Sequence, residues 1–122
     1  MAGYVSGGSI SNSYATGDIS GIAGVGGIAG TVGNGSTIQN NAAINPSITG
    51  IASVNRIVGF YDSSTIFNNI ALTDMAITPA GSNGESGSNA SGTDLKKRLT
   101  YETDLGWDFT TVWTILENES YP

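Results

Sequence analysis

The chain contains no cysteine and no histidine. Without cysteine it can have no disulfide bond, no thiolate ligand for a metal ion and no thiol nucleophile. Without histidine it lacks the commonest metal ligand and the usual general base near neutral pH, so a serine–histidine–aspartate triad is excluded. We therefore expect a protein that is not an enzyme and that uses no cofactor and no metal ion.

Charge is also scarce. Charged residues make up 11% of the 122 residues, and the net charge is −6. A negative chain repels the phosphate backbone, so nucleic acid is not an expected partner. Three of the four basic residues are adjacent, Lys96 to Arg98, and so short a run indicates a solvated surface. No apolar run is long enough for a transmembrane helix, so we expect no membrane insertion in this segment.

Glycine, by contrast, is abundant, with 18 residues, and small polar residues fill much of the remainder. A helical bundle needs longer side chains, so this composition argues against one. It favours many short strands joined by tight turns. Aliphatic residues still alternate with polar ones, which allows a hydrophobic core and argues against disorder for most of the chain.

The sequence repeats itself three times. The segments "SISNSYATGDISG", "TIQNNAAINPSITG" and "TIFNNIALTDMAI" begin at Ser9, Thr37 and Thr65. Three sets of equivalent residues are spaced by 28: Ile10, Ile38 and Ile66; Asn12, Asn40 and Asn68; and Ala15, Ala43 and Ala71. A second block, Val25–Gly30 and Val54–Gly59, has a step of 29, which one extra residue near Pro46 explains. Several matches in phase indicate a true repeat.

A unit of 28 residues cannot bury its own apolar face, whereas stacked units make a continuous core. Short alternating segments separated by glycine indicate two or three short strands per unit with sharp corners. The sequence thus predicts an all-β fold, a short parallel β-solenoid of about three rungs. We expect it to be right-handed, as parallel crossovers are.

Stacked rungs would place equivalent residues in ladders about 4.8 Å apart. We predict two aliphatic ladders and one polar ladder: Ile10, Ile38 and Ile66; Ile19, Ile48 and Met75; and Asn12, Asn40 and Asn68. The asparagine amides would hydrogen-bond along their ladder at a buried corner. Three amides could also form a ligand site, but the spacing favours the structural role.

The run Gly24–Gly30 superficially resembles a dinucleotide-binding loop. Such a loop needs a preceding parallel strand, a following helix and an acidic residue about 20 positions further on. Here Thr31–Gly35 follows, which cannot start a stable helix. Corner glycines with positive φ explain the run better than phosphate binding does.

These repeats resemble a known family. Val25–Gly30 ("VGGIAG") is similar to the GLUG motif, a Gly-apolar-small-Gly signature, and Asn12–Gly17 ("NSYATG") is similar to the "N-x-Y-A-T-G" segment that accompanies it. The second copy departs from the motif with Asn55 and Arg56, and the third has no closing signature after Ile77.

The last part of the chain carries a second resemblance. Thr100–Pro122 is similar to the "TY…GWDF…W.I…YP" segment that often follows such repeats. Together the two resemblances imply a bacterial secreted or cell-surface protein. The family occurs in large adhesins and beside the protease domain of IgA-specific metallopeptidases, whose zinc-binding His-Glu-x-x-His motif is impossible here without histidine.

We divide the chain into three segments: solenoid repeats at 1–79, a polar loop at 80–93 and an aromatic capping segment of the same domain at 94–122. Asp94 is expected to cap a short helix over Leu95–Tyr101, with Leu95 and Leu99 on one face. Two short strands are expected after it, one with Trp107 and Phe109 and one with Trp113 and Ile115.

Half of the aromatic residues lie beyond residue 100. A solenoid end exposes apolar rungs and unpaired strand edges, and the third repeat lacks a recognisable last strand. We predict that Trp107, Phe109 and Trp113 fold over that end and close it. The alternative is a glycan platform, in which Trp107 and Trp113 stack on a sugar and Asp108, with other acidic residues, binds its hydroxyl groups.

We therefore expect a non-catalytic structural or adhesive module, acting as a stalk or display segment. Its expected partners are neighbouring domains of a longer chain, with a host protein or a glycan as further candidates. A glycan-binding module and an accessory segment of a surface peptidase are the alternatives. The expected location is extracellular or on the bacterial cell surface. The first residues contain no apolar signal core, so we expect the signal and the anchor to lie outside this segment.

Overall fold

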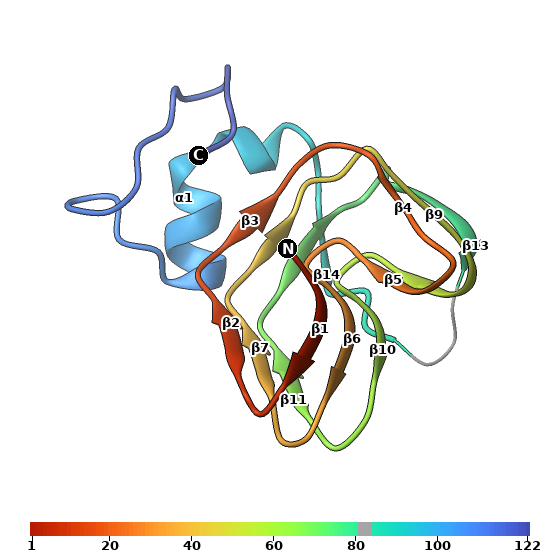
Figure 1. The fold of residues 1–122 in the computed structure, drawn as a ribbon. Helices are drawn as coiled ribbons and strands as arrows, with labels where there is room; N and C mark the ends of the chain where they lie inside the picture. Colours follow the sequence, from red (N-terminus) through yellow and green to blue (C-terminus); the bar gives the residue numbers. More distant parts are fainter. Residues whose placement is uncertain (81–83) are drawn as a thin grey trace.

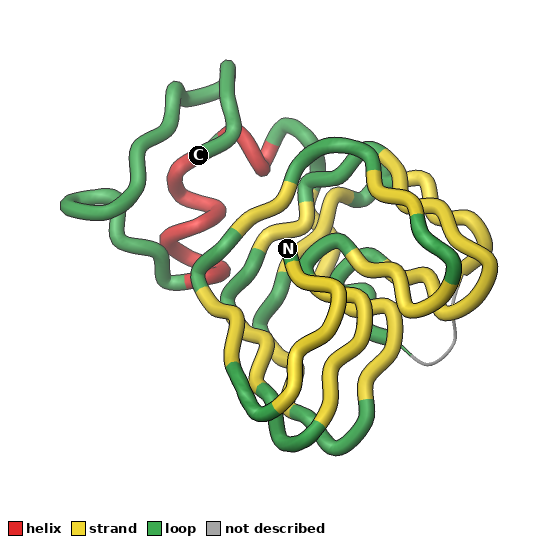
Figure 2. Tube along the Cα trace, in the orientation of Figure 1, coloured by secondary structure: helices red, strands yellow, loops and turns green. Residues whose placement is uncertain are grey.

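The computed structural model describes residues 1–80 and 84–122. Most of the chain winds into stacked turns of short strands, and a helix with irregular segments lies at their side (Figures 1 and 2). Seen from the first turn, the chain runs clockwise as it recedes, so the coil is right-handed (Figure 1). Every ladder between named strands is parallel. The predicted fold class, a right-handed parallel β-solenoid of about three rungs, is confirmed.

Each rung contains four or five short strands. Those of rung 1 are β1 (Ala2–Ser6), β2 (Ser9–Ser11), β3 (Tyr14–Ala15), β4 (Ile19–Ser20) and β5 (Ala23–Gly26). Those of rung 2 are β6 (Ala29–Gly33), β7 (Thr37–Gln39), β8 (Ala42–Ala43) and β9 (Ser47–Asn55). Those of rung 3 are β10 (Val58–Tyr61), β11 (Thr65–Phe67), β12 (Ile70–Leu72) and β13 (Ala76–Ala80).

A partial fourth rung follows and consists of one strand, β14 (Ser88–Ala90). This strand lies inside the segment that the sequence predicts as a polar loop. It forms because Ser88–Ala90 continues the ladder of β12, which needs only backbone groups and places no demand on side-chain polarity. Residues 81–83 of the predicted loop lie outside the described residues.

Equivalent strands of successive rungs form four sheets in the described part of the chain. Sheet A has the order β1-β6-β10, sheet B β2-β7-β11, sheet C β3-β8-β12-β14 and sheet D β4-β9-β13, and β5 also pairs with β9. Three short helical segments follow: η1 (Asp94–Lys96), α1 (Arg98–Thr100) and η2 (Tyr101–Leu105). Among the described residues, none of these helices has the length and apolar character needed to cross a bilayer.

The predicted stacking of Ile10, Ile38 and Ile66 is confirmed, since the ladders of sheet B pair Ile10 with Ile38 and Ile38 with Ile66. Only Ile38 is fully buried, while Ile10 and Ile66 are half-buried. The reason is their place at the two ends of sheet B, where an isoleucine has a neighbouring rung on one side alone.

The second predicted ladder is wrong in its last member. Ile19 pairs with Ile48 as expected, but Ile48 pairs with Ile77 instead of Met75. Met75 lies just before β13 and is buried in the same core, outside the ladder. The step of 29 between Val25 and Val54 is confirmed by their pairing.

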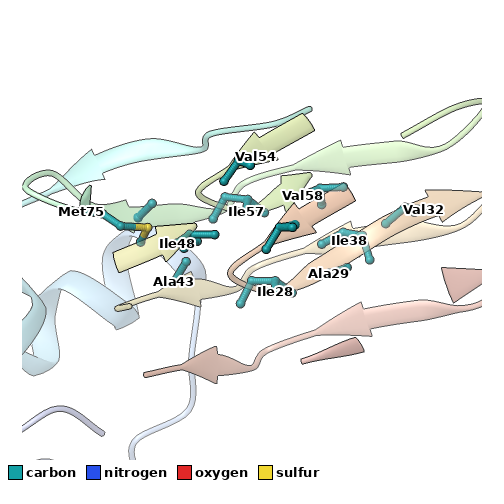
Figure 3. Close-up of a cluster of buried hydrophobic side chains, with 12 residues drawn as sticks. Ile28, Ala29, Val32, Ile38, Ala43, Ile48, Val54, Ile57, Val58 and Met75 are labelled. Carbon is teal, nitrogen blue, oxygen red and sulfur yellow. The ribbon is translucent and has the colours of Figure 1, made fainter. Parts of the chain in front are cut away.

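The core of the solenoid is a continuous column of aliphatic side chains that runs from rung to rung (Figure 3). Its centre belongs to rung 2 and the start of rung 3, where Ile28, Val32, Ile48 and Val54 are almost completely buried. The fully buried residues that sheet C contributes to this core are alanines, Ala43 and Ala71, while Leu72 packs against it partly buried. The small size of the alanines lets the opposite wall approach closely, which explains why the repeat keeps alanine at that position.

The glycines of the GLUG-like run differ from the prediction. Gly24 has a positive φ of 60°, as expected for a corner, but Gly26, Gly27 and Gly30 do not. These three are required by space: a Cβ at Gly26 or Gly30 would collide with backbone atoms, and one at Gly27 would also reach the Ala43 side chain. The motif therefore marks close approach between rungs and across the core.

The asparagine ladder is also placed differently from the prediction. Asn12, Asn40 and Asn68 occupy corners with left-handed φ values of 50°, 55° and 52°, a conformation that asparagine tolerates well. Asn68 Nδ2 donates to Asn40 Oδ1 at 2.6 Å. However, Asn12 and Asn68 are exposed, so this column does not carry the buried polar network.

The buried amides belong to the next residues, Asn41 and Asn69. Asn69 Oδ1 accepts hydrogen bonds from the backbone N and from Nδ2 of Asn41, each at 3.0 Å. The Nδ2 group of each asparagine donates to the backbone one rung earlier, at Ile10 for Asn41 and at Ile38 for Asn69. Asn41 Oδ1 accepts from the Ser13 backbone. This amide ladder ties three rungs together through side chains.

The C-terminal end of the solenoid is covered by a polar segment, not by the aromatic one. Residues 84–90 cross the end of the core, and Glu85 exchanges backbone hydrogen bonds with Val58 at 2.9 and 3.0 Å. A Cβ at Gly87 would touch the Ile57 side chain, so the chain lies directly on the core there. The predicted cap by Trp107, Phe109 and Trp113 at this end is therefore wrong in its placement.

Arg56 completes this end. It stands where rung 1 has Gly27, a position with no room for a side chain inside the stack. At the end of the stack the space is open, and the guanidinium donates to the carbonyl oxygens of Leu72 at 3.3 Å and Gly87 at 3.1 Å. Partial burial lowers its pKa from the usual arginine value. The departure of the second GLUG-like copy from the motif at Arg56 thus suits its place at the end of the stack.

We predict that Ile38→Ala lowers the free energy of unfolding by roughly 2–5 kcal/mol, because it empties a fully buried position in the core. Ile66→Ala should cost less, since Ile66 is half-buried. Urea denaturation followed by circular dichroism measures both. Ile22→Ala, at a side chain that is 75% exposed, is the control and should change stability little. Equal losses for the three variants would contradict the rung assignment.

We also predict that Asn69→Leu destabilises the fold by several kcal/mol, because it leaves the buried backbone N of Asn41 and one of the two N–H groups of its side-chain amide without an acceptor, at about 1–3 kcal/mol per stranded group. Asn68→Gly is the matched control: it removes the exposed amide but keeps a residue suited to a φ of 52°. Thermal denaturation distinguishes them. A larger loss for Asn68→Gly than for Asn69→Leu would show that the exposed column is the important one.

Candidate functional site: the aromatic flank

The helical segment that positions the C-terminal aromatics begins with a local hydrogen-bond pair. The Ser91 hydroxyl accepts from the Asp94 backbone N at 3.0 Å and bonds to the Asp94 carboxylate at 2.7 Å. Asp94 thus lies inside the first helical turn instead of capping it, and Lys97 Nζ pairs with it at 2.8 Å. Hydrogen bonds from Lys97 and Ser91 lower the pKa of Asp94.

The buried face of the helix differs from the predicted one. Leu95 is buried as expected, but Leu99 is 70% exposed. The helix extends to Leu105, and Tyr101 and Leu105, four residues apart, point inward. Gly106 ends it in a left-handed conformation with a φ of 68°. This stop turns the chain so that the residues after it run back along the solenoid.

The aromatic residues pack on the outer face of sheet C. Ala43 and Ala71 of this sheet face the solenoid core, whereas the alternate residues Ala42 and Ile70 belong to a second apolar cluster. That cluster is completed by Leu95, Tyr101 and Leu105 of the helix and by residues after it: Trp107, Phe109 and, partly buried, Trp113, Ile115 and Tyr121. The segment therefore covers the flank of the solenoid.

We call this set of rings the aromatic flank: Tyr14, Tyr101, Trp107, Phe109 and Trp113. The rings of Tyr101 and Trp107 are stacked with centroids 5.0 Å apart, and those of Trp107 and Trp113 are stacked at 4.3 Å. Trp113 then meets Tyr14 of rung 1 edge to face at 5.8 Å. Such pairs add stability beyond the burial of their area.

Two hydrogen bonds fix these rings to the backbone. Trp107 Nε1 donates to the carbonyl oxygen of Asn40 in rung 2 at 2.8 Å, and the Tyr101 hydroxyl donates to the carbonyl oxygen of Leu95. Burial raises the pKa of Tyr101 above the usual tyrosine value, so the hydroxyl stays protonated. Both polar groups of the cluster are thus satisfied inside the protein.

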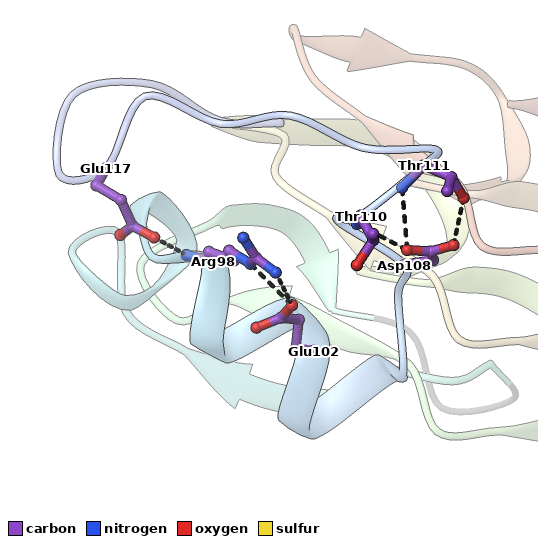
Figure 4. Close-up of polar contacts among 6 residues, drawn as sticks. All are labelled: Arg98, Glu102, Asp108, Thr110, Thr111 and Glu117. Atoms are coloured by element: carbon purple, nitrogen blue, oxygen red, sulfur yellow. Dashed lines mark hydrogen bonds and ion pairs between the residues drawn. The ribbon is translucent and has the colours of Figure 1, made fainter.

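Asp108 is occupied by its own turn (Figure 4). Its Oδ1 accepts from the backbone N of Thr110 at 2.7 Å and of Thr111 at 3.2 Å, and the Thr111 hydroxyl bonds to Oδ2. These bonds, the Thr111 hydroxyl first, lower the pKa of Asp108. The carboxylate shapes the loop that returns Trp113 to the solenoid, since the Trp113 backbone N also donates to the Asp108 carbonyl at 2.9 Å.

The structure brings the three predicted ligand-binding residues together, but two of them, Trp107 and Asp108, are already engaged by other residues of the protein. Trp107 is 3% exposed, and both faces of its indole are covered, by Tyr101 and by Trp113. Trp113 is half-buried. The two strands predicted between Trp107 and Ile115 do not form, because the region is a series of turns held by Asp108.

Two other acidic residues of this region, Glu102 and Glu117, are engaged locally. Glu102 forms an ion pair with Arg98 at 2.7 Å, and Glu117 Oε1 accepts from the Arg98 backbone N (Figure 4). Across residues 1–80 and 84–122, no three acidic side chains gather into a group that could hold a metal ion. The aromatic flank therefore attaches the C-terminal segment to the solenoid.

Sequence reasoning missed Tyr14 and Tyr101 as members of this site. Tyr14 belongs to the "N-x-Y-A-T-G" segment, where it takes the outward position next to the inward Ala15. An alternating strand with an aromatic residue on its outer face is a signal that something covers that face. Tyr101 could be found from its spacing to Leu105 on one helical face.

We predict that Trp107→Ala lowers the free energy of unfolding by roughly 3–5 kcal/mol, as expected for a buried aromatic side chain. Val112→Ala in the same segment, at a side chain that is 69% exposed, is the control.

Deleting the residues after Gly92 should give an insoluble or oligomeric protein, because it uncovers Ala42, Ile44 and Ile70 on sheet C. Light scattering after size-exclusion chromatography tests the deletion. A monomeric, folded truncated chain would refute the role of the flank.

Comparison with known proteins finds no family model that matches the chain, and no curated protein or solved structure that is significantly similar to it. The GLUG-like and "GWDF"-like resemblances therefore rest on their motifs alone.

Proposed function

We propose that this chain is a non-catalytic structural or adhesive module of a secreted or cell-surface bacterial protein, and that it acts as a stalk or display segment. The observation that supports the proposal best is the aromatic flank. One continuous segment contacts every rung: Tyr14 of rung 1, Asn40 of rung 2, Ile70 of rung 3 and Ala90 of the partial fourth rung.

This arrangement suits a module that must keep its shape outside the cell. A plain solenoid frays from its ends, because each rung contacts only its neighbours. Here, opening rung 1 also breaks the contact between Tyr14 and Trp113, and opening rung 2 breaks the hydrogen bond from Trp107 to Asn40. The flank thereby couples the rungs, so that the module opens as one unit. In this role the neighbouring domains of a longer chain are its first partners.

Glycan binding is a second candidate, and one observation favours it. Tyr14 remains 37% exposed beside the half-buried Trp113, which leaves aromatic surface open at the edge of the flank. A sugar ring could stack there. The covered faces of Trp107 and the engaged carboxylate of Asp108 argue against the wider platform.

The surface role is tested with antibodies against the folded chain. On bacteria that produce the protein, we expect equal labelling of intact and permeabilised cells, and loss of the signal after protease treatment of intact cells. Labelling that requires permeabilisation would refute a surface location. The sequence of any flanking peptidase domain would show whether the module serves as an accessory segment.

A glycan array separates the adhesive module from a glycan-binding one. We expect no binding above background for the purified chain. Binding that disappears in Tyr14→Ala, while the variant keeps its thermal stability within about 1 kcal/mol of the parent, would favour the glycan-binding candidate. Leu116→Ala, at a side chain that is 63% exposed, is the control for non-specific loss.

A further inference from the structure

We propose that the open edge of β11 is a docking site for an extended, positively charged peptide, which adds to sheet B as its fourth strand. The basis is an asymmetry between neighbouring sheets. Sheet C has four strands because β14 continues the ladder of β12, whereas sheet B ends at β11. Among residues 1–80 and 84–122, β11 pairs only with β7.

Among residues 1–80 and 84–122, no segment continues the ladders of sheets A and B beyond rung 3, and the described chain resumes at Gly84. It joins the start of β10 at Glu85 and then enters sheet C directly, with the Ser88 backbone N donating to the Asn69 carbonyl at 2.9 Å. A fourth strand of sheet B would run between the edge of β11 and this crossing segment.

A cavity of about 230 Å³ marks that space. It is lined by Ile66 and Phe67 of β11, by Asn68, and by Glu85, Gly87 and Ser88 of the crossing segment. A second cavity of about 380 Å³ shares Asn68 and Ser88 with it and reaches Asp104. The two form one groove from β11 towards the helix η2.

The groove provides what a β-strand needs. The free edge of β11 presents unpaired backbone N–H and C=O groups, which an added strand can satisfy. Ile66 is half-buried and Phe67 is 49% exposed, so an apolar side chain at the central position of the added strand would extend the isoleucine column and finish covering Ile66.

Charge indicates the kind of peptide. Glu85 and Asp104 lie at the two ends of the groove, and neither takes part in the two ion pairs found among the described residues. Arg56 lies near Glu85, but its guanidinium donates to the carbonyl oxygens of Leu72 and Gly87. Basic residues at both ends of a bound strand would therefore complement the groove.

A second copy of this chain is a poor occupant. Its net charge is also −6. In addition, Ser88–Ala90 already occupies the fourth-rung position of sheet C, which prevents the first rung of another copy from stacking flush against rung 3. An extended peptide of a few residues avoids both conflicts, because it fills sheet B alone.

The test is an NMR titration of the full ¹⁵N-labelled chain with the blocked peptide Lys-Ser-Thr-Ile-Gln-Lys. Its centre copies the strand of rung 2 that pairs with β11 in the molecule. We expect shifts of the amides of 65–67 and 85–88. The acidic peptide Glu-Ser-Thr-Ile-Gln-Glu and the proline peptide Lys-Ser-Thr-Pro-Gln-Lys should not bind, because one reverses the charge and the other removes the central N–H.

The matched variants are Glu85→Gln and Glu119→Gln. Glutamine at position 85 keeps the Oε1 that accepts from the Gly87 backbone N, so the crossing segment stays in place. We expect Glu85→Gln to weaken binding roughly three- to tenfold, as for one charge contact, and the exposed Glu119→Gln to leave it unchanged.

Asp104→Asn provides a second variant, on the helix end of the groove, with a similar expected loss. Equal effects of the position 85 and position 119 variants, shifts outside the groove, binding of the acidic or proline peptide, or no shifts at millimolar peptide would each overturn the proposal.

Discussion

The hydrogen-bonded register between rungs is the constraint on which the rest of this structure depends. Each strand is too short to be stable alone, and it is held only because an equivalent segment lies one rung away in the same register. The constraint acts on the backbone, so side chains must fit whatever spacing the ladders impose. Glycines such as Gly26 and Gly30 stand where neighbouring backbone leaves no room for a Cβ.

Polar groups obey the same constraint. Asn41 and Asn69 are buried without penalty because each amide reaches the backbone of the previous rung and the amide of its neighbour. Where the stack ends, no next rung is available. There Arg56 and the residues 84–90 take over, with long-range hydrogen bonds to carbonyl groups that a further rung would otherwise approach. The end of the solenoid is thus finished with polar atoms, while the large aromatic side chains cover its flank.

Much of the solenoid could be predicted from the sequence, because residues that recur at the repeat spacing occupy equivalent positions in successive rungs. The columns of Ile10, Ile38 and Ile66 and the pairing of Val25 with Val54 follow from spacing alone. Spacing fails where a turn absorbs a residue, which is why Ile77, not Met75, continues the column of Ile48. It also fails to tell an exposed corner asparagine from the buried one next to it, since both repeat with the same period.

The aromatic flank was harder to predict, since it occurs once and has no repeat to guide it. Aromatic content indicates that Trp107 and Phe109 are buried, but not on which surface. The partner surface is made of alternate residues of sheet C, such as Ala42 and Ile70, which look like ordinary small or aliphatic positions in the sequence. The contact between Tyr14 and Trp113 joins residues near opposite ends of the chain, and no local pattern reveals such a pair.

That distant contact also has a consequence for how the molecule is made. During synthesis the N-terminal rung emerges from the ribosome long before Trp113, and domains generally fold as the chain appears. The rungs can pair with one another early, since they are neighbours in sequence. The outer face of sheet C, however, stays uncovered until the segment that holds Trp107 and Trp113 has been translated. Formation of contacts between residues so far apart is slow. The nascent chain therefore passes through a stage with an exposed apolar surface, and a secreted form would benefit from a chaperone that covers this surface until the last segment arrives.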